Sequence, residues 1–197
     1  MNIREWNKQK LEQDEERYRH VLGAEKAAIL LAEKFGANPE KAGLAALLHD
    51  CAKLIPIERT LDIIKENNIE VLEVEKLSHK TLHAPVGAFL MKYELNIDDA
   101  EVLNAVRWHT IGRIEMGILE KIVFLSDKIE AETRSPEYVN KLWNVLNTTN
   151  DIDEGLLFCY GATIKSLVKR KMYINSQTIE VWNYLNEKLS KKTEGVF

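Results

Sequence analysis

The sequence predicts an all-α protein on three observations. Apolar residues recur at helical spacing through most of the chain. Sustained alternation of apolar and polar residues, the pattern of half-buried strands, is nearly absent. All four prolines fit the starts of helices or the connections between them, rather than helix interiors, where proline would remove a hydrogen bond.

The first predicted helix runs from Asp14 to Phe35. Six of its residues fall on one face: His20, Ala24, Ala27, Ala28, Leu31 and Phe35. Such a stripe faces a core, so we expect the side chain of His20 to point inward. Gly36 supplies the stop, because glycine is the residue that most often ends a helix.

A second helix is predicted to begin at Asn38 and Pro39, which read as an N-cap and a first-turn proline. It carries the apolar run 44–48 up to His49 and Asp50. The later predicted helices span 57–66, Pro85 through Met91, Asp98 or Asp99 to His109, 118–131, 136–146, 153–168 and 178–189. We expect the polar residues 190–197 to form a flexible tail.

Composition indicates one soluble globular domain over residues 1–197. Apolar residues make up 45% of the chain and charged residues 29%, and no composition break marks a second domain. A net charge of −4 provides no global field to attract nucleic acid. No apolar stretch approaches the roughly 20 residues that span a bilayer, so we expect no membrane partner and a cytoplasmic location. Cys51 and Cys159 are interpreted as packed thiols, because their spacing suits neither a disulfide framework nor a zinc site.

The sharpest local feature is the pentapeptide His49-Asp50-Cys51-Ala52-Lys53, which follows the apolar run 44–48. Adjacent helical residues point about 100° apart, so His49 and Asp50 reach one ion only near a helix end or a local distortion. Lys53 lies within reach of an anion held beside such an ion. Taken alone, the pair is more often a hydrogen-bonded structural feature.

Asp127 lies in the apolar stretch 122–129, where a buried carboxylate is costly unless a cation or strong donors compensate it. A salt bridge to an arginine is the ordinary alternative. His20 and His109 lie on apolar faces of predicted helices, where a single histidine is usually a structural residue whose hydrogen bonds are made within the core.

The joint arrangement favours a metal centre. Four of the five histidines lie on predicted buried faces or at helix starts. With two acids they form a set of six nitrogen and oxygen ligands in the order His20, His49, Asp50, His83, His109 and Asp127. Six ligands suffice for two ions that share a bridging group, or for one ion plus general-acid histidines. Imidazole and carboxylate without thiolate suit iron, manganese, cobalt, nickel or zinc.

The order of these residues resembles the H…HD…D pattern of the HD superfamily of metal-dependent phosphohydrolases. Five longer segments resemble the YqeK family within it: 17–20, 42–53, 82–88, 109–112 and 126–130. Members of that family are bacterial symmetrical bis(5'-nucleosyl)-tetraphosphatases, which use iron to split diadenosine tetraphosphate into two ADP. The resemblance covers roughly residues 15 to 186.

The resemblance implies a compact helical HD-type domain and specific roles for its matching residues. It implies that a divalent metal, iron as one or two ions, is held by His20, His49, Asp50 and Asp127. It implies that His83 and His109 complete the site near the metal or the phosphates. On chemical grounds we expect catalytic roles for Lys53, His83 and His109, with His109 as a proton donor to the departing ADP if it is not a ligand. The implied substrate-binding residues are Arg17, Lys53, His83, His109, Thr110 and Arg134.

The match has departures and leaves alternatives open. Ser126 and Ala131 stand where the family has alanine and proline, and Arg134 comes one residue late. The nearest alternative function is that of another HD enzyme, such as a deoxynucleotide phosphatase or a cyclic-nucleotide phosphodiesterase. A second alternative is a non-catalytic nucleotide-binding module. The sequence also leaves open whether the protein forms a homodimer. His79 is interpreted as a surface or loop residue, Arg113 as either phosphate-binding or solvated, and the cluster 165–171 as a solvated cationic face.

Overall fold

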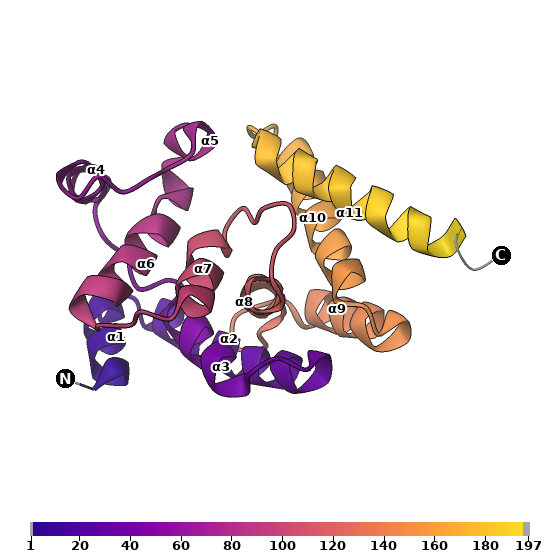
Figure 1. The fold of residues 1–197 in the computed structure, drawn as a ribbon, viewed down its shortest axis with the longest axis horizontal. Helices are drawn as coiled ribbons and strands as arrows, with labels where there is room; N and C mark the ends of the chain where they lie inside the picture. The colour runs from indigo at the N-terminus through magenta and orange to yellow at the C-terminus, as the bar shows by residue number, and fades with distance from the viewer. Residues whose placement is uncertain (1, 195–197) are drawn as a thin grey trace.

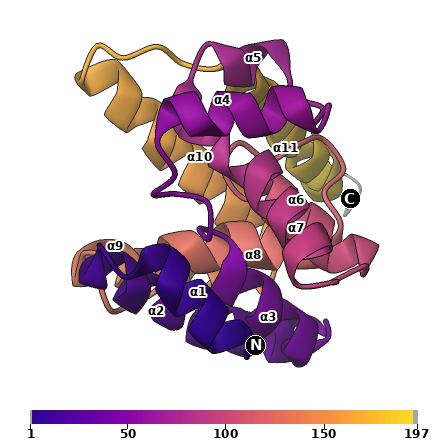
Figure 2. The ribbon, with the colours of Figure 1, turned by 90° about the vertical axis from the view of Figure 1, so that its left-hand side faces the viewer.

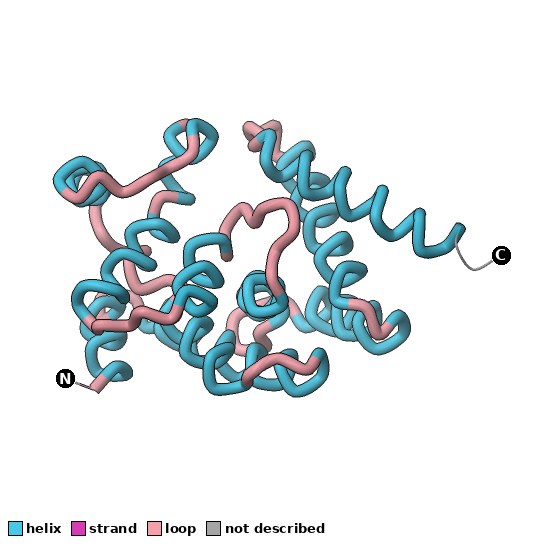
Figure 3. Tube along the Cα trace, in the orientation of Figure 1, coloured by secondary structure: helices cyan, strands magenta, loops and turns pink. Residues whose placement is uncertain are grey.

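The computed structural model describes residues 2–194, which form helices joined by loops and contain no strand (Figure 3). The all-α prediction is confirmed. The elements in chain order are α1 (Ile3–Leu11), α2 (Glu15–Phe35), α3 (Pro39–Leu48), α4 (Ile57–Glu66), α5 (Glu73–Lys76), the 3₁₀ helix η1 (His79–Thr81), α6 (His83–Glu94), α7 (Ala100–Trp108), α8 (Ile118–Ile129), α9 (Pro136–Thr149), α10 (Ile152–Lys169) and α11 (Ser176–Glu194).

Helix α8 forms the centre of the molecule, and Figure 1 shows it end-on with other helices around it. It packs against α2, α3, α7, α9 and α10. Its buried apolar residues join one main hydrophobic cluster that extends from Trp6 in α1 to Leu185 in α11. Figure 2 shows α4 and α5 on one side of the molecule, apart from the layer formed by α1, α2 and α3. A helix buried on several sides in this way is a rigid support for a functional side chain.

The predicted caps are present where the sequence placed them. Asn38 accepts hydrogen bonds from the backbone of Glu40 and Lys41, and Pro39 occupies the first turn of α3. Asp99 caps α7. Gly36 ends α2 with φ 73°, a left-handed conformation that glycine adopts without steric cost.

The structure differs from the prediction at both ends of the chain. The charged N-terminal segment contains α1, which the sequence analysis did not anticipate; Trp6 and Leu11 are buried, and buried Asn7 donates a hydrogen bond to the carbonyl of Leu47. Helix α11 continues to Glu194, so residues 190–194 are helical, and 195–197 of the predicted tail lie outside the described residues. None of the helices in residues 2–194 combines the length and hydrophobicity that crossing a membrane requires.

Candidate metal centre

The six predicted ligands meet in one place, although they come from five separate parts of the chain. All are at least nine-tenths buried: His20, His49, Asp50, His83, His109 and Asp127. Two of them project from helix interiors, His20 from α2 and Asp127 from α8, and these two helices pack against each other. The other four lie at the end of α3, the start of α6 and the end of α7.

The end of α3 has the local distortion that the sequence analysis required. The α-helix stops at Leu48, and the chain continues in tight turns in which Cys51 N donates to Leu48 O and Lys53 N to Asp50 O. These hydrogen bonds join residues three apart, as in a 3₁₀ helix. His49 and Asp50 therefore face the same site, despite being adjacent in sequence.

The four buried histidines share one orientation. Three donate from Nδ1 to a backbone carbonyl three residues earlier: His49 to Ala46 at 2.6 Å, His83 to Lys80 at 2.8 Å and His109 to Val106 at 2.7 Å. A carbonyl can only accept, so Nδ1 carries the proton and Nε2 of a neutral ring is a lone-pair acceptor. His20 has the same arrangement, with its Nδ1 3.0 Å from Glu130 Oε1.

Glu130 reaches His20 because Gly23 leaves room for it. A Cβ atom at Gly23 would lie 2.6 Å from Glu130 Oε2. Glu130 is itself held by the backbone amides of Glu132 and Thr133. Burial raises the pKa of Glu130, but its hydrogen bonds from His20 and Thr133 outweigh this and lower the pKa to about 2. The carboxylate is therefore ionised and fixes the ring of His20, as carboxylates do beside metal-binding histidines.

The Nε2 atoms converge in two groups that share one carboxylate. One group is His20, His49 and Asp50, and the other is Asp50, His83 and His109; within each, the ligand atoms lie within 4.8 Å of one another. Nε2 of His20 is 3.3 Å from Nε2 of His49, and Nε2 of His83 is 3.1 Å from that of His109. Asp127 adds an oxygen 3.0 Å from His20 Nε2.

This spacing fits ligands of a common cation. Two atoms each about 2.1 Å from one ion, at an angle of about 90° to 109°, lie about 3.0 to 3.4 Å apart. Without a cation, the neutral rings of His83 and His109 would point the lone pairs of their Nε2 atoms at each other across 3.1 Å. Each of the two groups would therefore hold a divalent ion, and a single ion in either group would fit as well.

Protonation in the cluster follows from burial and from its neighbours. Burial lowers the pKa of His49 to about 4 and also lowers the pKa values of His83 and His109, so these rings are neutral at pH 7. Burial acts in the same direction on His20, but hydrogen bonds to Asp127 and Glu130 outweigh it and raise its pKa. Neutral imidazole is the form that binds a metal.

A cavity of about 310 Å³ opens onto the cluster, and its walls are strongly cationic. Two carboxylates line it, those of Asp50 and Asp127, but five cationic side chains do: Arg17, Lys53, Lys80, Lys128 and Arg134. Such an excess in a protein of net charge −4 favours a polyanionic ligand. The cavity is therefore suited to phosphate groups beside the metal ligands.

The predicted substrate-binding residues all reach this cavity. Arg17 Nη1 lies 2.9 Å from Asp50 Oδ2, and Arg134 Nη2 lies 2.7 Å from Asp127 Oδ1. Asp127 therefore forms the salt bridge to an arginine that was the alternative to metal binding, and it also lies beside His20. Lys53 Nζ lies 3.3 Å from His83 Nε2, and the Oγ1 atom of Thr110 is buried without a hydrogen-bond partner.

Some residues near the site were missed or left open by the sequence. Glu130, Lys80 and Lys128 received no role. For Glu130 a signal existed, because it lies three residues after Asp127 on the same helical face. Arg113, which was left open, pairs with Glu120 at 2.8 Å and does not line the cavity. His79 is exposed in η1, in agreement with its interpretation as a surface residue.

Comparisons with known proteins agree with this geometry. Residues 17–132 match the model of the HD domain family. The chain is 36% identical over 175 residues to a symmetrical bis(5'-nucleosyl)-tetraphosphatase of Bacillus subtilis, covering 87% of this chain and 90% of that protein. It is 30% identical over 172 residues to the protein of the same name from Staphylococcus aureus, covering 87% and 88% of the two chains.

A solved structure has the same fold. It is a crystal structure described as a predicted HD superfamily hydrolase involved in NAD metabolism from Clostridium acetobutylicum. The two structures superpose with a TM-score of 0.86 at 34% sequence identity, over 94% of this chain and 96% of the other. The arrangement of helices around the cluster is therefore shared with a structure determined by experiment.

Proposed function

This chain belongs to the HD domain family and, within it, to the symmetrical bis(5'-nucleosyl)-tetraphosphatases, and from that premise we propose how its own residues carry out the reaction. The enzyme hydrolyses diadenosine tetraphosphate and related dinucleotides into two nucleoside diphosphates. The observation that carries the assignment of its centre is the common orientation of four buried histidines, each with Nδ1 bonded to an oxygen and Nε2 turned to a shared carboxylate.

The metal ligands in this proposal are His20, His49, Asp50, Asp127, His83 and His109. The tautomer of His83 and His109 supports ligation rather than proton donation, because a neutral ring with its proton on Nδ1 has none to give from Nε2. When bound, a divalent ion supplies Lewis acidity toward phosphoryl oxygens and a lowered pKa for a coordinated water. Iron is our proposal for its identity, and the imidazole and carboxylate donors suit it.

The cationic side chains bind and orient the phosphate chain. Lys53 and Arg17 contact Asp50, while Lys128 and Arg134 contact Asp127. Together they neutralise the charge that moves to the leaving group when the central phosphoanhydride bond breaks. The departing ADP ends in a phosphate whose second pKa is about 6, so it leaves as an anion near neutral pH and these cations replace a general acid. The hydroxyl of Thr110 is free to donate to a phosphate oxygen.

The two cysteines support a cytoplasmic location. Cys51 and Cys159 are buried free thiols, which a reducing compartment preserves. We place the enzyme there, together with its nucleotide substrate.

The test is an analysis of products in isotopically labelled water. Purified enzyme is incubated with diadenosine tetraphosphate, with and without ferrous ion, and each product is identified by mass. We expect two ADP, with one label on the terminal phosphate of one of them, and turnover that depends on metal. AMP together with ATP would show attack at an outer phosphorus and would contradict the proposed register. Release of inorganic phosphate from mononucleotides at a higher rate would indicate a different HD activity.

A further inference from the structure

Two larger cavities border the cavity at the metal centre, because each shares lining residues with it. The central one is the cationic cavity described above. Lys128 and Arg134 also line a second cavity, between α9 and α10. Lys53, Lys80 and His83 also line a third, between the start of α4 and η1. We name these two the α9–α10 cavity and the α4–η1 cavity.

The two outer cavities are alike in size. Each has a volume of about 410 Å³, against about 310 Å³ for the central one. Sites for small ligands usually measure about 300 to 1,000 Å³, so each outer cavity has room for one nucleoside. Two spaces of equal size that border a phosphate-binding centre through different residues match a substrate with two identical ends.

The three cavities differ in chemistry in the way such a substrate requires. Every residue that lines the central cavity is polar or charged. The outer cavities add apolar walls, formed by Tyr138, Ala162 and Leu167 on one side and by Ala52, Ile55 and Ile57 on the other. Phosphates favour the cationic middle, while a purine ring favours apolar and aromatic surface.

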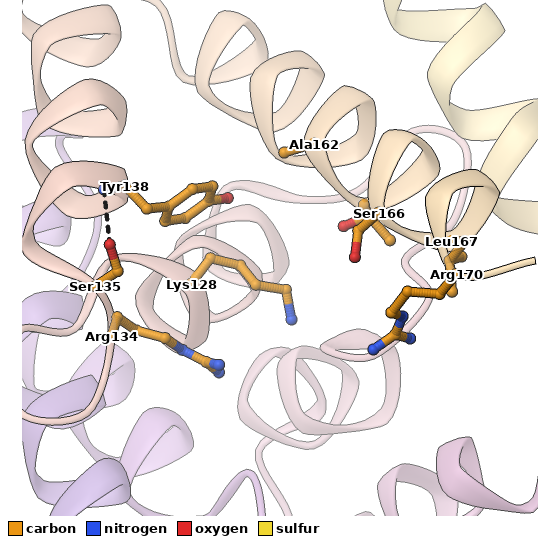
Figure 4. A pocket seen from close by; sticks show the side chains of 9 residues that line it. Lys128, Arg134, Ser135, Tyr138, Ala162, Ser166, Leu167 and Arg170 are labelled. Carbon is orange, nitrogen blue, oxygen red and sulfur yellow. Dashed lines mark hydrogen bonds between the residues drawn. The ribbon is translucent and has the colours of Figure 1, made fainter. Parts of the chain in front are cut away.

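The α9–α10 cavity combines the cationic, hydroxyl and aromatic side chains that suit a nucleotide. Figure 4 shows the charged ends of Lys128, Arg134 and Arg170 turned toward one space, with Tyr138 and Ser166 beside it. Lys128 and Arg134 lie toward the metal centre, since both contact Asp127. Tyr138 is fixed by its hydroxyl, which donates to Cys159 Sγ at 3.3 Å, so its ring is a preformed surface for a base.

The α4–η1 cavity repeats this plan with other residues. Lys53 and Lys80 lie at its border with the centre, and Ile55 and Ile57 line it without lining the central cavity. His79 adds an imidazole ring from η1, a surface on which a base can stack.

We propose that the α9–α10 and α4–η1 cavities each hold one nucleoside of the dinucleotide, an inference that rests on the proposed function. Anchoring both ends places the middle of the phosphate chain against the metal ligands, so the bond that breaks is the central one. The symmetry of cleavage then follows from the equal outer cavities. Ile57, His79, Tyr138, Ser166 and Arg170 become the residues that select the substrate.

The test fills each outer cavity separately. Ser166→Trp on α10 fills the α9–α10 cavity, and Ile57→Trp on α4 fills the α4–η1 cavity. Their controls are Lys165→Trp and Glu58→Trp, which add the same side chain at exposed neighbouring positions that line neither cavity. Metal-loaded enzymes are compared on diadenosine tetraphosphate and on inorganic tetraphosphate, which has the phosphate chain without nucleosides. Binding of ADP is measured by titration calorimetry.

We expect each filling variant to lose about tenfold or more in kcat/KM for the dinucleotide, and less than twofold for inorganic tetraphosphate. The unmodified enzyme should bind two ADP per chain, each single variant one, and the double variant none. The controls should behave like the unmodified enzyme. Ser166→Leu and Ile57→Phe, which fill less space, serve if a tryptophan variant does not fold.

Two results would overturn the inference. One is a single ADP per chain in the unmodified enzyme, and the other is an equal loss on both substrates in the filling variants, which would show damage to the metal centre. Failure of the proposed function is a separate outcome. In that case the unmodified enzyme does not cleave diadenosine tetraphosphate, while the ADP stoichiometry of the variants still reports whether the outer cavities bind nucleotides.

Discussion

The protein buries carboxylates in two polar clusters that look similar by charge and burial but differ in their partners. Asp153, on α10, is 3% exposed. Its Oδ1 accepts from Lys121 at 2.6 Å and its Oδ2 lies 2.8 Å from Lys188. Burial raises the pKa of Asp153, but the two lysines outweigh this and lower it. Every acceptor in this cluster faces a donor, so the cluster is complete without a ligand.

The cluster around Asp50 has the opposite balance. Asp50 is 2% exposed, and its oxygens face the Nε2 atoms of His20, His49, His83 and His109. Arg17 and Lys53 contact Asp50 as well, but the Nε2 atoms of the neutral rings of His49, His83 and His109 are acceptors that face this carboxylate. The comparison teaches that a buried acid is not itself a sign of function. What distinguishes a candidate ligand set from a structural ion pair is a surplus of acceptors over donors, which a metal ion would balance.

The largest expected effect comes from removing the shared carboxylate. Asp50→Ala should abolish metal binding and reduce hydrolysis of diadenosine tetraphosphate by about a thousandfold or more, because both ligand groups lose a member. Helical content should stay close to that of the unmodified protein. Metal analysis, product assay and circular dichroism measure the three quantities, and His49→Ala should behave alike. If either variant bound no metal but kept full activity, the proposed metal centre would not be the site of hydrolysis.

The same substitution in the other cluster should have the reverse effect. Asp153→Ala leaves Lys121 and Lys188 facing each other without an anion, and breaking such a buried pair costs about 3 kcal/mol in the free energy of unfolding. The thermal midpoint should fall by about 10 °C, while bound metal per folded chain stays unchanged. Scanning calorimetry and metal analysis on one sample decide between the clusters. A loss of metal equal to that of Asp50→Ala would show that the Asp153 cluster is also needed for metal binding.

The parts of the site that could be predicted are those carried by helical periodicity. His20, His109 and Asp127 lie on apolar helix faces, and a polar residue on such a face points into the core wherever the helix packs. His49 and Asp50 follow an apolar run that ends a helix. These local signals made each residue a candidate, and the joint arrangement with the resemblance to HD enzymes favoured a metal centre. The structure places the residues together.

The remaining parts depend on contacts between distant segments. The segment that contains α5 and η1 has no long periodic pattern, and it is anchored by Glu75, which accepts two hydrogen bonds of 2.7 Å from Arg107 on α7. That pair brings Lys80 to the cavity, and nothing local in the sequence links residues 75 and 107. The sequence predicted that Arg170 is part of a solvated face. The cavity that it lines forms only where α9 and α10 pack against each other, and no local pattern predicts that contact.

A smaller effect should separate substrate binding from metal binding within the centre. Lys53 has no lone pair for a metal when protonated, yet its Nζ lies 3.7 Å from Asp50 Oδ1 and lines the cationic cavity. Lys53→Ala should lower kcat/KM for diadenosine tetraphosphate by about 30-fold, the value of one charged hydrogen bond, with little loss of metal. Steady-state kinetics and metal analysis check this, with exposed Lys141→Ala as the control. Loss of metal as in Asp50→Ala, with unchanged KM, would contradict it.

The smallest effect tests whether orientation of a ligand, rather than its presence, matters. Glu130 is 1% exposed, and its Oε1 lies 3.0 Å from His20 Nδ1 and 3.7 Å from Arg134 Nε. Glu130→Gln keeps the shape and one acceptor oxygen but removes the charge that fixes the His20 ring, so metal affinity should fall by about tenfold. Competition with a chelator measures the affinity, and exposed Glu137→Gln is the matched control. Excess metal should restore kcat, because all six ligands remain. A variant that binds metal normally but has a low kcat at saturating metal would show that Glu130 acts on the substrate. The role of Glu130 beside His20 would then differ from that of the backbone carbonyls beside the other three histidines, although all four rings have the same orientation.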